Sequence, residues 1–173
     1  MKKTTTHRMV KMAFMTAISV ILFYFEFPMP GSPLQFDLSD LPVIFTGYLL
    51  GFGPGVMVAL LKNIVHALFI SRNAGIVGEL ANFMYAVVIM LPIALIRVKG
   101  TGKTILLCTF TVLYSSFLML VLNYYITFPL YGLSQVGAWG ILFSVYLPFN
   151  LIKGSILMLL YYISMPLLNR LKV

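Results

Sequence analysis

The chain has 173 residues, of which 61% are hydrophobic and 9% are charged. This composition, with a mean hydropathy of +1.00, excludes an ordinary soluble domain and predicts an integral membrane protein. The formal net charge is +8, but the basic residues lie in short flanks and not on one folded face. We therefore expect anchoring at the membrane surface, with lipid as a partner, and no nucleic-acid partner.

Prolines, glycines and charged clusters divide the chain into six apolar segments. Because a helix needs about 20 apolar residues to cross the hydrocarbon, we predict helices at about 9–26, 41–50, 55–70, 76–96, 104–130 and 140–168. The first apolar segment lacks a small-residue cleavage site, so it is interpreted as a retained helix and not as a signal peptide. The sequence thus predicts an all-α membrane protein with six transmembrane helices in a single domain, residues 1–173.

The predicted second helix is too short to span a membrane alone. It follows a proline-rich segment, residues 27–33, that forbids regular helix. Unpaired backbone groups cannot face lipid, so the ends of a half-length helix need surrounding protein. We therefore expect this segment and the short helix to line a cavity.

The charges are distributed unevenly along the chain. Nine of the 12 basic residues fall at the two termini or between the fourth and fifth predicted helices: Lys2, Lys3, Arg8, Lys11, Arg97, Lys99, Lys103, Arg170 and Lys172. The acidic residues fall on or near the opposite face: Glu26, Asp37, Asp40 and Glu79. Because Lys and Arg concentrate on the cytoplasmic side, we predict a multi-pass protein of the cell membrane with both termini in the cytoplasm.

Two lysines, Lys62 and Lys153, fall within predicted membrane helices, where a lysine normally pairs or lines a wet site. Lys62 has three open interpretations: a functional group, a structural pair with Glu79 or Asp40, or a side chain that snorkels to the membrane surface. Lys153 follows Asn150 by three residues on one helical face, and Asn123 lies at a similar depth. Two carboxamides and a lysine suit the edge of a heterocycle that bears carbonyls and ring nitrogens. These three residues therefore predict a ligand site open to the outside.

The residues give little support to an enzyme. The single cysteine, Cys108, and the two histidines, His7 and His66, provide neither a metal-ligand set nor a nucleophile with a matching base. We expect no metal, no cofactor and no ATPase activity of the chain's own. A self-sufficient ion-coupled transporter stays an alternative, although no inverted repeat or acidic residue near mid-membrane supports it.

Seven segments, in order along nearly the whole chain, resemble the riboflavin-specific S component of energy-coupling-factor (ECF) vitamin transporters. They are Pro28-Met29-Pro30, residues 36–42 (FDLSDLP), residues 53–63 (GPGVMVALLKN), residues 79–83 (ELANF), Leu122-Asn123-Tyr124, residues 129–132 (PLYG) and residues 147–154 (LPFNLIKG).

This resemblance implies a high-affinity subunit that captures riboflavin as its transported ligand, without a motor of its own. By position it implies a riboflavin site made from Asn123, Asn150 and Lys153, the pair Glu79 and Asn82, and Leu34, Phe36 and Asp37 of the first loop. The alternative is an S component for another flavin or vitamin.

Ala13 and Ala17 stand one turn apart on the first predicted helix, a small-xxx-small pair that lets another helix approach closely. The resemblance implies that this pair docks on the transmembrane T component, which two ATPase subunits drive.

Overall fold

A computed structural model describes residues 2–29, 34–69 and 75–171. The elements in chain order are α1 (Lys2–Tyr24), β1 (Phe27–Pro28), β2 (Gln35–Phe36), α2 (Asp40–Leu50), α3 (Phe52–Phe69), α4 (Gly75–Leu95), α5 (Thr101–Leu122), the π-helix η1 (Asn123–Thr127), α6 (Phe128–Leu130), α7 (Ala138–Ile141), the π-helix η2 (Leu142–Tyr146) and α8 (Leu147–Leu171). Each predicted helix is present, although α1 already begins at Lys2, because no proline or glycine precedes Pro28.

Among the described residues, five helical segments are long and apolar enough to cross a membrane: Thr6–Tyr24, Phe52–Phe69, Gly75–Leu95, Thr101–Leu130 and Ala138–Leu171. The eleven-residue α2 is apolar but shorter. The structure is therefore that of a multi-pass helical membrane protein.

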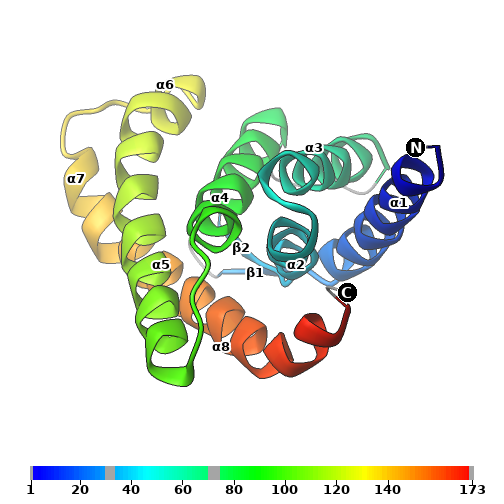
Figure 1. Cartoon of the computed structure of the whole chain (residues 1–173). Helices are drawn as coiled ribbons and strands as arrows, with labels where there is room; N and C mark the ends of the chain where they lie inside the picture. The colour runs from blue at the N-terminus through cyan, green and yellow to red at the C-terminus, as the bar shows by residue number, and fades with distance from the viewer. Residues whose placement is uncertain (1, 30–33, 70–74, 172–173) are drawn as a thin grey trace.

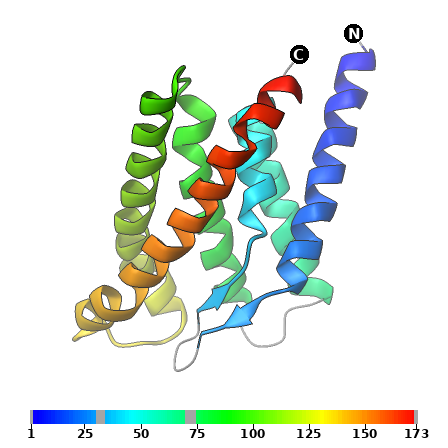
Figure 2. The same ribbon diagram turned by 90° about the horizontal axis from the view of Figure 1, so that it is seen from below.

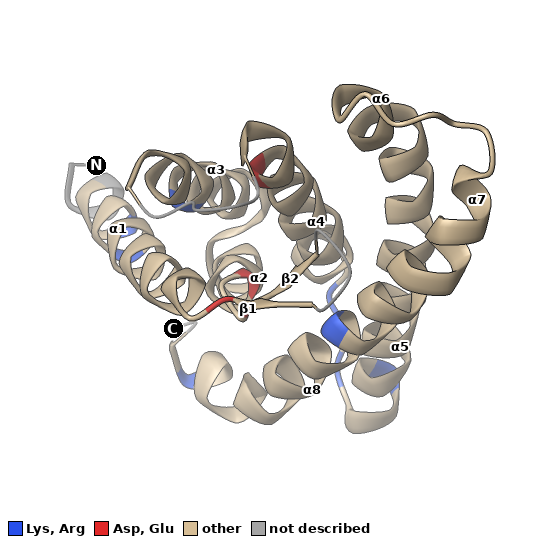
Figure 3. Cartoon of the chain, turned by 180° about the vertical axis from the view of Figure 1, so that it is seen from behind, with Lys and Arg blue, Asp and Glu red and all other residues tan. Residues whose placement is uncertain are grey.

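The helices form one bundle with distinct ends. The two termini and the connection between α4 and α5 lie at the same end, whereas the two-stranded ribbon β1–β2 and the connection between α6 and α7 lie at the other (Figure 2). In the ribbon, Phe27 pairs with Phe36 and Pro28 with Gln35. The basic flanks, which lie at the termini and between α4 and α5, are consequently at one end of the bundle (Figure 2). The acidic residues lie near the ends of α1, α2 and α4 (Figure 3).

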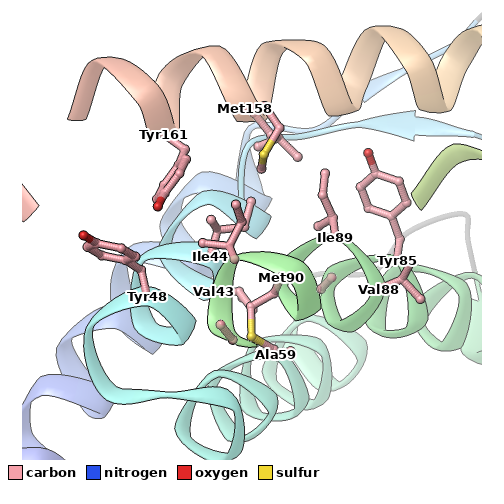
Figure 4. Close-up of a cluster of buried hydrophobic side chains, with 14 of the residues drawn as sticks. Val43, Ile44, Tyr48, Ala59, Tyr85, Val88, Ile89, Met90, Met158 and Tyr161 are labelled. Atoms are coloured by element: carbon pink, nitrogen blue, oxygen red, sulfur yellow. The ribbon is translucent and has the colours of Figure 1, made fainter. Parts of the chain in front are cut away.

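The short helix α2 lies in the middle of the bundle, in contact with α1, α3, α4 and α8 (Figure 1). Val43 and Ile44 are fully buried in the main apolar core, with Met90 of α4 and Tyr161 of α8 (Figure 4). The predicted need for surrounding protein is thus met by other helices.

Two arginines cover the C-terminal end of α2. Arg97 Nη1 donates to the Tyr48 carbonyl at 2.6 Å, and Arg8 Nη2 donates to the Leu50 carbonyl at 3.2 Å. Cations at a helix C-terminus satisfy its unpaired carbonyls and favour the helix dipole. This pairing explains how a helix that stops short of a full span ends within the protein.

Gly47 allows α2 to approach α4 closely. A Cβ atom at Gly47 would stand 2.4 Å from Met90 Sδ and 2.5 Å from Met90 Cγ, and Met90 is fully buried. We expect Gly47→Ala to destabilise the protein by about 1 to 3 kcal/mol, because Met90 must leave its packed position. Thermal unfolding in detergent measures the change. The control Gly53→Ala, whose Cβ meets nothing within 4 Å, should keep the melting temperature of the parent.

Candidate ligand-binding site

A pocket opens among the described part of loop 1 (residues 25–29 and 34–39), the first half of α4, the C-terminal part of α5 with η1, and the start of α8. The cavity itself has a volume of about 80 Å³, which is below the range of about 300 to 1,000 Å³ for small-molecule sites, and the empty space reaches about 670 Å³ when the open mouth is included. Its lining residues are Phe23, Leu34, Gln35, Gly78, Glu79, Ala81, Asn82, Tyr85, Met119, Asn123, Thr127, Tyr131, Tyr146, Phe149, Asn150 and Lys153.

Two π-helical segments shape one side of this pocket. In η1 the Phe128 amide bonds to the Asn123 carbonyl, and in η2 the Leu147 amide bonds to the Leu142 carbonyl, each across five residues. Pro129 and Pro148 follow these segments and lack the amide hydrogens that regular α-helix would require. The shifted register presents Asn123 and Thr127 to the pocket, in agreement with the frequent use of π-segments at functional sites.

Several polar atoms of the lining have no hydrogen-bond partner among the described residues. They are Glu79 Oε2, Tyr85 Oη, Thr127 Oγ1 and Asn150 Nδ2. Buried polar groups in proteins are normally satisfied, so such a set indicates a site for a ligand with both donors and acceptors. Burial and the Glu79 carboxylate raise the pKa of Tyr131, which keeps another phenolic proton at the pocket.

Behind the pocket lies a cluster of four buried charges, Asp37, Asp40, Lys62 and Lys153, which we call the four-charge cluster. Lys153 Nζ is 2.9 Å from Asp37 Oδ2 and 3.0 Å from Asp40 Oδ2, and Lys62 Nζ is 2.5 Å from Asp40 Oδ1. Two cations thus face two carboxylates, which offsets the cost of burying each charge.

Asp37, in loop 1, stays ionised in this setting. Burial alone raises its pKa, but the ammonium groups of Lys153 and Lys62 and a hydrogen bond from Ser39 outweigh burial and hold the pKa below its usual value. Asn82 Nδ2 also donates to Asp37 Oδ2 at 3.2 Å, and Asn82 Oδ1 accepts from Lys62 at 2.9 Å. The cluster therefore ties loop 1 to α3, α4 and α8.

Six of the eight predicted ligand residues line the pocket: Leu34, Glu79, Asn82, Asn123, Asn150 and Lys153. Phe36 instead lines a separate apolar hollow with Phe27 and Ile152, and Asp37 lies behind Lys153. Of the two structural pairs considered for Lys62, the structure forms the one with Asp40. Glu79 contacts His66 instead.

Five polar lining residues were not among the predicted ligand residues: Gln35, Tyr85, Thr127, Tyr131 and Tyr146. Tyr85 stands three residues after Asn82, so the helical repeat could have placed it on the same face. Thr127 lies four residues after Asn123, but inside a π-segment whose register the sequence alone does not reveal.

The predicted docking pair lies on an open face of α1. Ala13 and Ala17 are both exposed, and the nearby apolar side chains of Val10, Phe14 and Ile21 are exposed by 60%, 63% and 60%. Within the described part of the chain, no other helix covers this face.

Comparison with known proteins gives the family. Residues 7–165 match the family model described as the substrate-specific component of ECF transporters. The chain belongs to this family. Relatives of this S component include the "Riboflavin transporter FmnP" of Bacillus subtilis (strain 168), 30% identical over 169 residues, which span 89% of the chain and 87% of the relative.

A second relative is the "Riboflavin transporter RibU" of Staphylococcus aureus (strain TCH60), 30% identical over 165 residues, which span 89% of the chain and 86% of the relative. A solved S component of a bacterial ECF transporter shares 28% of its sequence with the chain at a TM-score of 0.79, over 98% of this chain and 99% of that one. These relatives are transporter components and not enzymes, so the family agrees with the lack of a catalytic residue set in the sequence.

Proposed function

We propose that this S component binds riboflavin at the pocket, from the extracellular side, and passes it inward as part of an ECF-type importer. The observation that carries the proposal is the set Asn123, Asn150 and Lys153, which converges on one pocket from η1 and α8. The names of the two bacterial relatives support riboflavin as the ligand.

The chemistry of the pocket fits a flavin ring. Carboxamides of Asn123 and Asn150 present donors and acceptors in fixed planes, and Lys153 adds a donor. A flavin ring offers carbonyl oxygens and ring nitrogens along one edge, and aromatic side chains of the lining, such as Tyr85 and Phe149, suit its apolar faces.

The orientation of the protein in the membrane follows from the distribution of its basic residues. The end of the bundle that holds both termini carries most of the basic residues, so it faces the cytoplasm, and the pocket opens toward the outside. With α2 in the middle of the bundle, the chain has six membrane helices, one of them shortened.

The S component has partner subunits that provide the energy for riboflavin uptake. The exposed pair Ala13 and Ala17 docks on a T component, and two ATP-binding subunits drive the T component. A face of small side chains allows the close helix contact that such docking needs.

Asn150→Ala tests the ligand site directly. We expect this change to weaken riboflavin binding by about 1 to 3 kcal/mol, because a buried ligand group loses its hydrogen-bond partner. Equilibrium titration by quenching of riboflavin fluorescence measures the dissociation constant. The control is Asn169→Ala on the same helix, an exposed residue whose Oδ1 accepts from Tyr48 and which is not part of the pocket. Equal affinities of Asn150→Ala and the parent would remove Asn150 from the site.

A further inference from the structure

His66 occupies an unusual place in α3. It is fully buried, its Nδ1 lies 2.7 Å from Glu79 Oε1, and its Nε2 lies 3.7 Å from Glu26 Oε2. Its ring stacks on that of Phe23, with centroids 3.5 Å apart and planes inclined by 8°. The imidazole thus joins α1, α3 and α4 at the level of the pocket.

His66 does not line the pocket, but two of its neighbours do. Phe23 and Glu79 both form part of the lining. One oxygen of Glu79 is held by His66, while the other, Oε2, is buried and has no hydrogen-bond partner among the described residues. Any effect of His66 on a ligand must therefore pass through these neighbours.

The other charged groups near His66 do not compete for its contact with Glu79. Lys62 stands one turn earlier on α3, but its ammonium group is bonded to Asp40, Ser39 and Asn82. The carboxylates that face the imidazole are Glu26, after α1, and Glu79, on α4. Among the described residues, His66 is accordingly the side chain that contacts Glu79 Oε1.

A carboxylate oxygen only accepts hydrogen bonds, so Glu79 Oε2 suits a hydroxyl or N–H donor and repels a carbonyl oxygen. The ring edge, with two carbonyls and one N–H, fits Asn123, Asn150 and Lys153 instead, because the two carboxamides provide both donors and acceptors. We propose that His66 is a positioning residue: it fixes Glu79 so that Oε2 accepts a hydrogen bond from a hydroxyl of the ligand's side chain. This inference rests on the proposed function, since riboflavin joins a flavin ring to a hydroxylated chain.

The test compares riboflavin with lumiflavin, which keeps the ring but has a methyl group in place of the hydroxylated chain. His66→Leu should weaken riboflavin binding about tenfold or more, the effect of losing a hydrogen bond to a charged group, and should change lumiflavin binding by less than about twofold. His66→Asn, whose amide can replace the Nδ1 donor, should recover most of the riboflavin affinity.

A double-mutant cycle separates positioning from general support of the fold. Because His66 acts through Glu79, His66→Leu combined with Glu79→Leu should bind riboflavin no more weakly than Glu79→Leu alone.

His66→Gln is the second variant in case His66→Leu does not fold, and it should also lower the ratio of riboflavin to lumiflavin affinity. Its amide reaches the Nε2 position, which faces Glu26. His7→Leu, the same change at the chain's other histidine, is the matched control.

Equal losses for the two flavins, or additive losses in the cycle, would overturn the positioning role while leaving riboflavin capture intact. If the parent chain bound lumiflavin and riboflavin equally well, the contact with the hydroxylated chain would also be wrong. A parent chain that binds neither flavin would contradict the proposed function itself, so the two failures are distinguishable.

Discussion

Replacing Lys153 with methionine is expected to destabilise the folded protein by about 3 to 5 kcal/mol, because removal of one partner leaves buried charge uncompensated. Lys153 is 3% exposed and lies within 3.0 Å of both Asp37 and Asp40. Without it, Lys62 would face two buried carboxylates alone. Thermal unfolding in detergent and the yield of folded protein measure the effect.

The same substitution at an exposed lysine provides the control. Lys103→Met, at the start of α5, should leave the melting temperature nearly unchanged. Asp37→Asn added to Lys153→Met should restore part of the lost stability, since one uncompensated carboxylate becomes neutral. A Lys153→Met variant as stable as the parent would show that the four-charge cluster does not support the fold.

The double substitution Ala13→Leu with Ala17→Leu should abolish energised uptake and leave riboflavin affinity unchanged. Both residues are exposed on α1, away from the pocket, so larger side chains would hold a partner helix apart without disturbing the ligand. Uptake of labelled riboflavin by vesicles that contain the S component, the T component and both ATPases measures the first effect, and fluorescence titration measures the second.

Ala67→Leu, at another exposed alanine, on α3, is the matched control and should retain uptake. Persistent uptake by the double variant would mean that α1 does not provide the docking surface. Loss of riboflavin binding would instead point to a change within the bundle.

The four-charge cluster also suggests how loop 1 and the pocket communicate. Asp37 belongs to loop 1, whereas Lys153 and Asn82 belong to the pocket wall, and both contact Asp37. A ligand group that engages Lys153 or Asn82 would therefore bind next to the contacts that hold loop 1. This is a short physical path from ligand to loop, through two side chains.

Much of the architecture could be predicted from the sequence, because proline, glycine and charge mark the helix ends strongly in an apolar chain. The short second helix and its need for surrounding protein followed from its length, since its ends cannot face lipid. The expectation that this helix lines the cavity was wrong, because no α2 residue is among those that line the pocket. The convergence of Asn123, Asn150 and Lys153 followed in part from the three-residue spacing of the last two.

The sequence could not predict side-chain partners that depend on the crossing of distant helices. Lys62 could have paired with Glu79 or Asp40, and the structure shows Asp40. Phe36 and Asp37 are neighbours in an extended segment, where successive side chains point to opposite faces, so one lies in an outer hollow and the other in the interior. The positions of Asn123 and Thr127 depend on a π-segment that propensity does not reveal.

The most direct test of riboflavin capture is to purify the chain in detergent from cells grown with riboflavin, record its absorption spectrum, and titrate the ligand-free form with riboflavin. We expect a yellow protein whose riboflavin fluorescence is quenched in a saturable titration with about one site per chain, as a single pocket of this kind requires. A colourless protein that does not quench riboflavin would contradict the account, and the pocket would then have to serve another ligand.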